Sequence, residues 1–151
     1  AIGMTSGGLN FDVIIDKNDD VNIIEIGPRN GGNLLPELIE YCTGVDMKKY
    51  AIKTALGEDC SDLKMTYENK YFSHYVIHSQ QTGELLSYKK TTKLKQHVFY
   101  EHYNMKVGDL ISKYENSSNR LGMFLLKYND KEEMLDIIYN MDEYFILKYY
   151  E

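Results

Sequence analysis

Two short runs rich in β-branched residues, separated by a polar turn, constrain the fold of this chain more than any other feature. The runs are Val13–Ile15 and Ile23–Ile26, and the stretch between them, Lys17–Asp20, is entirely polar. Two such runs joined by turn residues predict an antiparallel β-hairpin. A turn at the centre of the polar stretch pairs Asp12 directly with Glu25.

Strand alternation predicts that the two faces of this hairpin differ. The face with the acidic pair is expected to carry Asn10, Asp12, Ile14, Asp16, Ile23, Glu25 and Gly27. The reverse face is apolar and is expected to belong to the core; it consists of Phe11, Val13, Ile15, Ile24 and Ile26. One face is therefore predicted to be structural and the other to be a site.

The facing carboxylates of Asp12 and Glu25 indicate what this site binds. Directly opposed residues on antiparallel strands have Cβ atoms roughly 5 Å apart, and like charges there are destabilising unless something neutralises them. Mg²⁺ prefers oxygen ligands and commonly uses one or two carboxylates together with substrate phosphates. The pair therefore predicts a magnesium site. A surface hairpin with solvated acids is the alternative, because acidic residues beside turns are common.

A glycine-rich segment follows the second run and favours the metal-site interpretation. Gly27–Asn33 reads GPRNGGN, in which the glycines permit close backbone approach and Pro28 stiffens the exit from the strand. Arg29 offers a planar donor group to a carboxylate or a phosphate. Metal ligands, a fixed cation and open backbone are thus predicted to converge.

These residues resemble the C-terminal half of an ATP-grasp domain, whose last two core strands carry an acidic residue and then a Glu-x-Asn-x-Arg-type motif. Asp12 matches the first acid, Glu25 the second and Arg29 the arginine. The segment Glu-Ile-Gly-Pro-Arg-Asn-Gly-Gly is most similar to the corresponding segment of the carboxylate-amine ligase and carbamoyl-phosphate-synthase-like branch. Gly27 departs from the pattern, since many members have a metal-binding Asn there. Either Asn30 or a water completes the second metal shell, or one ion is held less firmly.

The resemblance implies an enzyme that uses ATP and Mg²⁺, or Mn²⁺, to activate a carboxylate as an acyl phosphate for coupling to an amine or ammonia. Asp12 and Glu25 would hold the metal and the ATP phosphates, Arg29 would clamp the carboxylate or acyl phosphate, and Asn30 would position substrate or metal. The family also has upstream strands whose lysines hold phosphates, and these are absent here. The chain is therefore expected to be the inactive C-terminal part of a longer ligase.

The expected fold class is α+β, in two parts. Residues 1–57 are the C-terminal portion of the ATP-grasp catalytic domain, with two helices that pack beneath the hairpin, one capped by Asn33 and ended by Gly44, the other capped by Asp46 and ended by Gly57. Residues 58–151 form a small antiparallel β/α subdomain like that of biotin-carboxylase-like enzymes. Its strands are expected at 71–79, 84–88, 96–103, 121–128 and 144–149, and its helix at 131–140 after Asp130.

Composition excludes several other classes of protein. The formal net charge is −6 and the basic residues are dispersed, which argues against nucleic-acid binding. No stretch approaches the length of a membrane span and no basic-then-apolar leader opens the chain, so no membrane partner is expected. The two cysteines, Cys42 and Cys60, have no metal-ligand or disulfide spacing, which fits the cytoplasm.

Several further candidates have simpler structural interpretations. His74 and His78 share a strand face, but no third zinc ligand is specified. Arg120 could reach a substrate, but a surface salt bridge is the favoured interpretation, and the lysines of residues 89–95 suit a solvated hairpin. No nucleophile elbow or reactive cysteine signature supports covalent catalysis.

Two alternatives to the ligase remain open from sequence. One is a non-catalytic module whose antiparallel sheet mediates self-association or partner binding; the other is a Ca²⁺- or metal-binding hairpin that needs no nucleotide. The expected partners under the leading hypothesis are small-molecule carboxylate and amine substrates. A homodimer is compatible with an exposed sheet edge.

Overall fold

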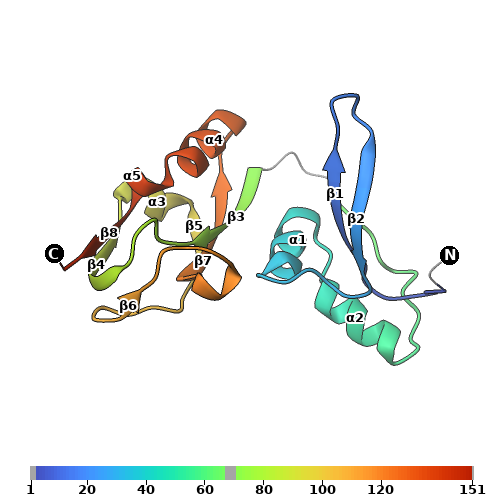
Figure 1. The fold of residues 1–151 in the computed structure, drawn as a ribbon. Helices are drawn as coiled ribbons and strands as arrows, with labels where there is room; N and C mark the ends of the chain where they lie inside the picture. Colours follow the sequence, from blue (N-terminus) through green and yellow to red (C-terminus); the bar gives the residue numbers. More distant parts are fainter. Residues whose placement is uncertain (1–2, 67–70, 151) are drawn as a thin grey trace. The chain divides into compact units, whose positions relative to one another are not determined.

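The computed structural model describes residues 3–66 and 71–150, and these fall into two compact units, residues 1–68 and 69–151 (Figure 1). The boundary expected from sequence lay earlier, between residues 57 and 58. Residues 58–66 belong to the first unit here, where Lys53 Nζ contacts Asp62 Oδ1 at 2.9 Å and Thr66 N donates to Thr43 O. The α+β class is as predicted.

The first unit opens with the predicted hairpin, formed by β1 (Asn10–Ile15) and β2 (Val21–Gly27). The turn between them is held by the Asp16 carboxylate, which accepts hydrogen bonds from Asn18 N (2.8 Å) and Asp20 N (3.1 Å). Asp19 adopts a left-handed conformation with φ 64°. The turn therefore forms from its own side chains, as polar turn residues allow.

A β-bulge in the hairpin changes one predicted face. Asp12 pairs with Glu25 as expected, but the register shifts between Asp12 and Val13, so that Val13 pairs with Ile23. The placement of Ile23 on the acidic face was therefore wrong, because the extra residue of the bulge moves it to the reverse face. The bulge lies immediately beyond the acidic pair and leaves that pair in register.

The apolar side chains of the hairpin are exposed. Ile15 and Ile24, for example, are 62% and 64% exposed, and Phe11, Val13, Val21 and Ile23 are exposed as well. The expectation that this face is core covered by the two following helices is therefore not met within the described residues. A run of exposed apolar side chains of this kind marks an interaction surface.

Two helices follow the glycine-rich segment, α1 (Leu35–Thr43) and α2 (Met47–Ala55). The cap of α1 was predicted wrongly: Leu34, not Asn33, takes the N-cap position, because both residues have left-handed backbone and the helix starts one residue later. Asp46 caps α2 as predicted and accepts from Lys48 N and Lys49 N. Of the large apolar side chains in residues 3–66, Val45 alone is buried.

The second unit contains two three-stranded antiparallel sheets where a single sheet was expected. One has the order β3-β7-β5, formed by Tyr71–Ile77, Gly122–Tyr128 and Val98–Tyr103. The other has the order β6-β4-β8, formed by Leu110–Ile111, Gly83–Lys90 and Phe145–Tyr149. The helices are α3 (Thr92–His97), α4 (Lys131–Tyr139) and α5 (Met141–Tyr144), with a 3₁₀ turn at Ser117–Asn119.

The lysine-rich segment after β4 is helical, which corrects two predictions. Thr91 accepts a hydrogen bond from Leu94 N and starts α3, so the strand expected from residue 96 begins only at Val98. The lysines do not form a solvated hairpin: Lys90 pairs with Glu101, and Lys93 Nζ lies 2.9 Å from Asp136 Oδ2. These cations join α3 and β4 to neighbouring elements.

The core of the second unit draws on both sheets and on α4. Its fully buried side chains include Ile77, Leu85, Leu94, Phe124, Leu126 and Ile137. Phe124 and Phe145 meet edge to face with ring centroids 5.1 Å apart, which joins β7 to β8. Burying each such side chain stabilises the fold by roughly 2–3 kcal/mol. No helix in the described ranges is long and apolar enough to cross a membrane.

Gly122 provides a test of this packing. Its φ is +153°, and a Cβ atom there would lie 2.3 Å from the backbone oxygen of His102 on the paired strand β5. We expect Gly122→Ala to lower the free energy of unfolding by about 3 kcal/mol, since backbone atoms must move. Urea unfolding followed by circular dichroism measures this.

Gly108→Ala is the matched control, because Gly108 has φ +91° but nothing within 4 Å of an added Cβ. It should cost only the conformational strain, about 1 kcal/mol. Equal losses in the two variants would contradict the steric explanation.

Candidate functional site

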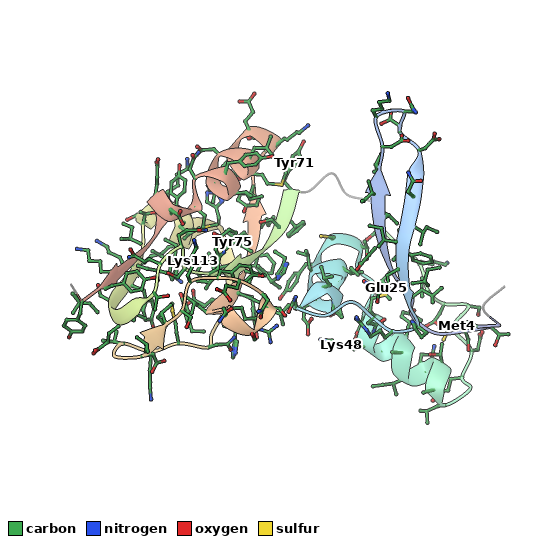
Figure 2. The ribbon with its side chains drawn as sticks, viewed as in Figure 1. Met4, Glu25, Lys48, Tyr71, Tyr75 and Lys113 are labelled. Carbon is green, nitrogen blue, oxygen red and sulfur yellow. The ribbon has the colours of Figure 1, made fainter. Side chains whose placement is uncertain are left out.

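Asp12 and Glu25 lie directly opposite each other on β1 and β2, toward the end of the hairpin remote from its turn (Figure 2 labels Glu25). Opposed residues of an antiparallel pair project to the same face, with Cβ atoms roughly 5 Å apart. Both side chains are exposed. Neither forms an ion pair with a basic side chain of the described residues. Two negative charges therefore share one open face.

The segment after β2 returns to this end of the hairpin through Asn10. Asn10 Nδ2 donates to Asp12 Oδ1 (3.2 Å). A Cβ atom on Gly31 would lie 3.0 Å from Asn10 Oδ1 and 2.7 Å from Leu35 Cδ1, so only glycine fits without a shift of these side chains. Glycine allows the backbone to approach other groups this closely because it has no side chain. The glycine-rich segment thus lies beside the acidic pair.

Arg29 lies on the acidic face. A Cβ atom on Gly27 would point to the same face as Glu25, two residues earlier on the strand. That position is 3.6 Å from Arg29 Cγ and 3.8 Å from Arg29 Nε. Arg29 N donates to Gly27 O (2.8 Å), which folds the arginine back over the strand end, and Arg29 Nη1 donates to Asn30 O (3.0 Å). An added Cβ on Gly27 would be in ordinary van der Waals contact with Arg29, so the Arg29 side chain lies over the end of the strand.

Asn30 makes contacts of a different kind. Its Nδ2 donates to Met47 O (3.2 Å) at the start of α2, and its Oδ1 is buried without a hydrogen-bond partner. A Cβ atom on Gly8 would lie 2.2 Å from that Oδ1, so the amide fits against the backbone of the Gly8 loop. In this arrangement Asn30 joins two parts of the scaffold. Its predicted role toward substrate or metal stays a prediction.

The donor set of this face fits magnesium and does not fit zinc. Within residues 3–66 and 71–150, no group of three or more His, Cys, Asp or Glu side chains is placed to hold a metal. Structural and catalytic zinc sites require at least three protein ligands. Mg²⁺ keeps several waters and takes one or two carboxylates with substrate phosphates, which two exposed acids satisfy.

The other candidates do not assemble into a site. His78 follows β3, with its Nδ1 2.9 Å from Val76 O, whereas His74 Nε2 is buried without a partner and burial lowers the pKa of His74. No group of three potential metal ligands among the described residues includes them. Burial raises the pKa of the Cys42 thiol, which keeps it protonated and unreactive.

Sequence reasoning placed Asn10 on the acidic face and Gly31 in the converging segment, but it did not predict the contacts that they make. Asn10 is two residues before Asp12, so strand alternation already placed it on the acidic face. Its hydrogen bond to Asp12 depends on the side-chain rotamer, and the approach of Gly31 depends on how the segment folds back. Neither is encoded in local residue pattern.

Comparison with solved structures finds the same fold in several enzymes. An L-amino acid ligase from Bacillus licheniformis is 22% identical with a TM-score of 0.81, covering 99% of this chain and 38% of the ligase. Phosphoribosylglycinamide synthetase from Anaerococcus prevotii is 24% identical with a TM-score of 0.73, covering 94% of this chain and 37% of the synthetase. The biotin carboxylase domain of 2-oxoglutarate carboxylase from Hydrogenobacter thermophilus is 18% identical with a TM-score of 0.61, covering 93% and 31% respectively.

No protein-family model matches the sequence, and no curated protein matches it significantly. The chain spans less than two fifths of the length of the solved structures above. This chain therefore shares its fold with part of each of these enzymes. The fold that the resemblance implied is therefore confirmed.

Manganese binding tests the acidic pair directly in this chain. We expect Mn²⁺ to broaden the amide NMR signals around Asp12 and Glu25, because it accepts the same oxygen ligands as Mg²⁺ and is paramagnetic. Asp12→Asn should weaken this binding about tenfold, the loss of roughly 1.4 kcal/mol expected when one charged ligand is removed.

Asp19→Asn is the control, since it removes the same charge from the turn of the hairpin. An equal loss of Mn²⁺ binding in both variants would mean that the ion responds to the charge of the whole hairpin and not to the facing pair.

Proposed function

We propose that this chain provides the magnesium-binding part of an ATP-grasp ligase that activates a carboxylate as an acyl phosphate and couples it to an amine or ammonia. The observation that carries the proposal is the pairing of Asp12 with Glu25 on one face, with Arg29 on the same face. The fold supports it, because the solved structures with this fold include an amino acid ligase and a glycinamide synthetase.

Each residue has a role that follows from its chemistry. Asp12 and Glu25 would hold Mg²⁺ against the ATP phosphates, where the ion neutralises the charge that develops during phosphoryl transfer. Magnesium is named for the Hydrogenobacter carboxylase domain, which was solved with MgADP and bicarbonate. Arg29 would clamp the carboxylate or the acyl phosphate through its planar donors. Asn30 would act as a positioning residue, through its bond to Met47 O.

The proposed reaction proceeds in two steps. A carboxylate oxygen of the substrate attacks the γ-phosphorus of ATP, the bond to the ADP oxygen breaks, and an acyl phosphate forms. The amine nitrogen then attacks the acyl carbon, phosphate leaves with the bonding electrons, and the amine loses a proton to solvent. Positioning and charge neutralisation suffice for both steps, which agrees with the absence of a reactive nucleophile signature in the sequence.

The glycine at position 27 bears on the number of metal ions. A side chain there would meet Arg29, whose Cγ is 3.6 Å from the position of an added Cβ. We propose that, because Gly27 has no side chain to offer as a ligand, Asp12 and Glu25 would hold one Mg²⁺ ion and water would supply the further ligands.

The exposed apolar face of the hairpin supports assignment to a larger enzyme. Ile15 and Ile24 are 62% and 64% exposed, and Val45 is the one large apolar side chain buried in residues 3–66. We propose that further ATP-grasp elements cover this face in the full enzyme. The same exposure also favours a second candidate function, a non-catalytic module that self-associates through the hairpin.

Substitutions separate the two functions when they are made in the full enzyme, which carries this chain together with the remaining ATP-grasp elements. Asp12→Asn and Glu25→Gln should each lower kcat/KM for ATP-dependent ligation by at least about 100-fold, because transition-state charge loses its counterion. Trapping the acyl phosphate with hydroxylamine, and measuring hydroxamate and ADP, follows the activated carboxylate.

Arg29→Lys keeps the charge but removes the planar donor pair, so it should raise KM for the carboxylate more than it changes KM for ATP. Asp19→Asn should leave the activity unchanged. Retained ligation in Asp12→Asn and Glu25→Gln would refute the role given to the acidic pair. Absence of ligation in the unsubstituted protein, together with an altered oligomeric state after Ile24→Ser, would support the self-association module.

This chain alone should bind MgATP weakly. The described residues offer two metal ligands, and the lysine-bearing strands that the resemblance assigns to phosphate binding are not among them. Calorimetric titration should give a Kd above about 1 mM, equivalent to roughly −4 kcal/mol or weaker. A Kd below about 10 μM would show that the chain binds the nucleotide without those strands.

A further inference from the structure

The second unit contains a cavity of about 170 Å³ whose lining has no part in the acidic face of the hairpin. It lies between the end of β3 with the loop that follows, residues 78–81, and the segment formed by α5 and β8. Tyr75, labelled in Figure 2, is on its wall. Ligand pockets for drug-sized molecules measure roughly 300–1,000 Å³, so this cavity suits a smaller ligand.

The floor of the cavity is apolar and rigid. Ile77, Met141 and Phe145 line it and are 0%, 3% and 5% exposed. They belong to the core of the second unit and connect β3 to α5 and β8. A cavity built on core residues keeps its shape, because interiors pack at high density and side chains there sit in fixed rotamers.

Aromatic rings form the walls. Tyr75 and His78 lie with ring centroids 5.8 Å apart and an interplanar angle of 31°, and Tyr149 completes the lining from β8. Tyr149 OH donates to Ser79 Oγ (2.6 Å), and Ser79 Oγ donates to Gln81 O (2.6 Å). The buried serine thereby fixes both the loop and the tyrosine ring.

The charge of the cavity is negative. Among the described residues that line it, Asp142 is the only one with a full charge at neutral pH, and no lysine or arginine is present. Asp142 is exposed at the first turn of α5 and forms no ion pair or side-chain hydrogen bond with any described residue. The charge of Asp142 also acts on Tyr75. Burial and, to a smaller extent, the Asp142 carboxylate raise the pKa of the Tyr75 hydroxyl to about 12.

The histidine adds an acceptor to this lining. His78 Nδ1 lies 2.9 Å from Val76 O. A carbonyl oxygen only accepts hydrogen bonds, so Nδ1 carries the proton and, in the neutral ring, Nε2 is the acceptor. The lining therefore combines aromatic side chains, one carboxylate and one imidazole, with no lysine or arginine among its residues.

We propose that this cavity binds a small organic ammonium ion between the rings of Tyr75 and Tyr149 and the carboxylate of Asp142. A cation over aromatic faces is attracted by the ring quadrupoles, and a carboxylate at the rim compensates the charge that is removed from water. The site is independent of the proposed ligase function, because none of its residues belongs to the hairpin or the glycine-rich segment.

Choline chloride and its neutral carbon isostere, 3,3-dimethylbutan-1-ol, are the probes that test this. Each is titrated into the ¹⁵N-labelled chain and followed by amide chemical shifts. Choline should give saturable shifts confined to residues 75–81 and 141–149, and the neutral isostere should bind at least about tenfold more weakly, as expected when the cation–π and charge terms are lost.

Asp142→Asn should weaken choline binding about tenfold, whereas Glu143→Gln, which removes the same charge from the adjacent position of α5, should leave it within about twofold. Both positions are exposed, so both variants are expected to fold. Equal affinity for choline and the alcohol, equal effects of the two variants, or no saturable shift in residues 75–81 and 141–149 would each overturn the proposal.

Discussion

The antiparallel pairing of Asp12 with Glu25 is the constraint on which the rest of the site depends. Two carboxylates on opposed positions repel each other, and a fold keeps such a pair only where the backbone register fixes it or a cation neutralises it. Here the register does so: the bulge lies just beyond the pair, and the turn is closed by Asp16. Asn10 donates to Asp12, and the arginine folds over Gly27 onto the same face.

The two units differ in how they are stabilised. In the second unit, buried side chains from both sheets and α4 form one core, and aromatic rings such as Phe124 and Phe145 join the sheets. In residues 3–66, Val45 is the one large apolar side chain that is buried, while the hairpin exposes its apolar residues. The unit with the candidate site therefore holds its geometry mainly through local hydrogen bonds, caps and strand pairing.

Local chemistry was predictable wherever a residue acts on its own backbone. Asp46 caps α2 and Asp130 caps α4, because the carboxylate of an extended N-cap residue accepts from free amides of the first turn. The expected strand at residue 71 and the pairing of Asp12 with Glu25 also formed. The predictions failed where contacts with other parts of the fold determine the structure. The helix α3 forms where the strand was expected to begin, because Thr91 caps it and Leu94 is buried.

The sequence by itself determined the hairpin, the acidic pair and the caps of α2 and α4, since each depends on residues close together in the chain. Only the tertiary structure decided that the second unit has two sheets, that a bulge moves Ile23 to the reverse face, and that Arg29 donates to Asn30 O while Asn30 donates to Met47 O. These choices depend on packing between distant segments and on the close approach of Asn30 to Gly8, which no local pattern records.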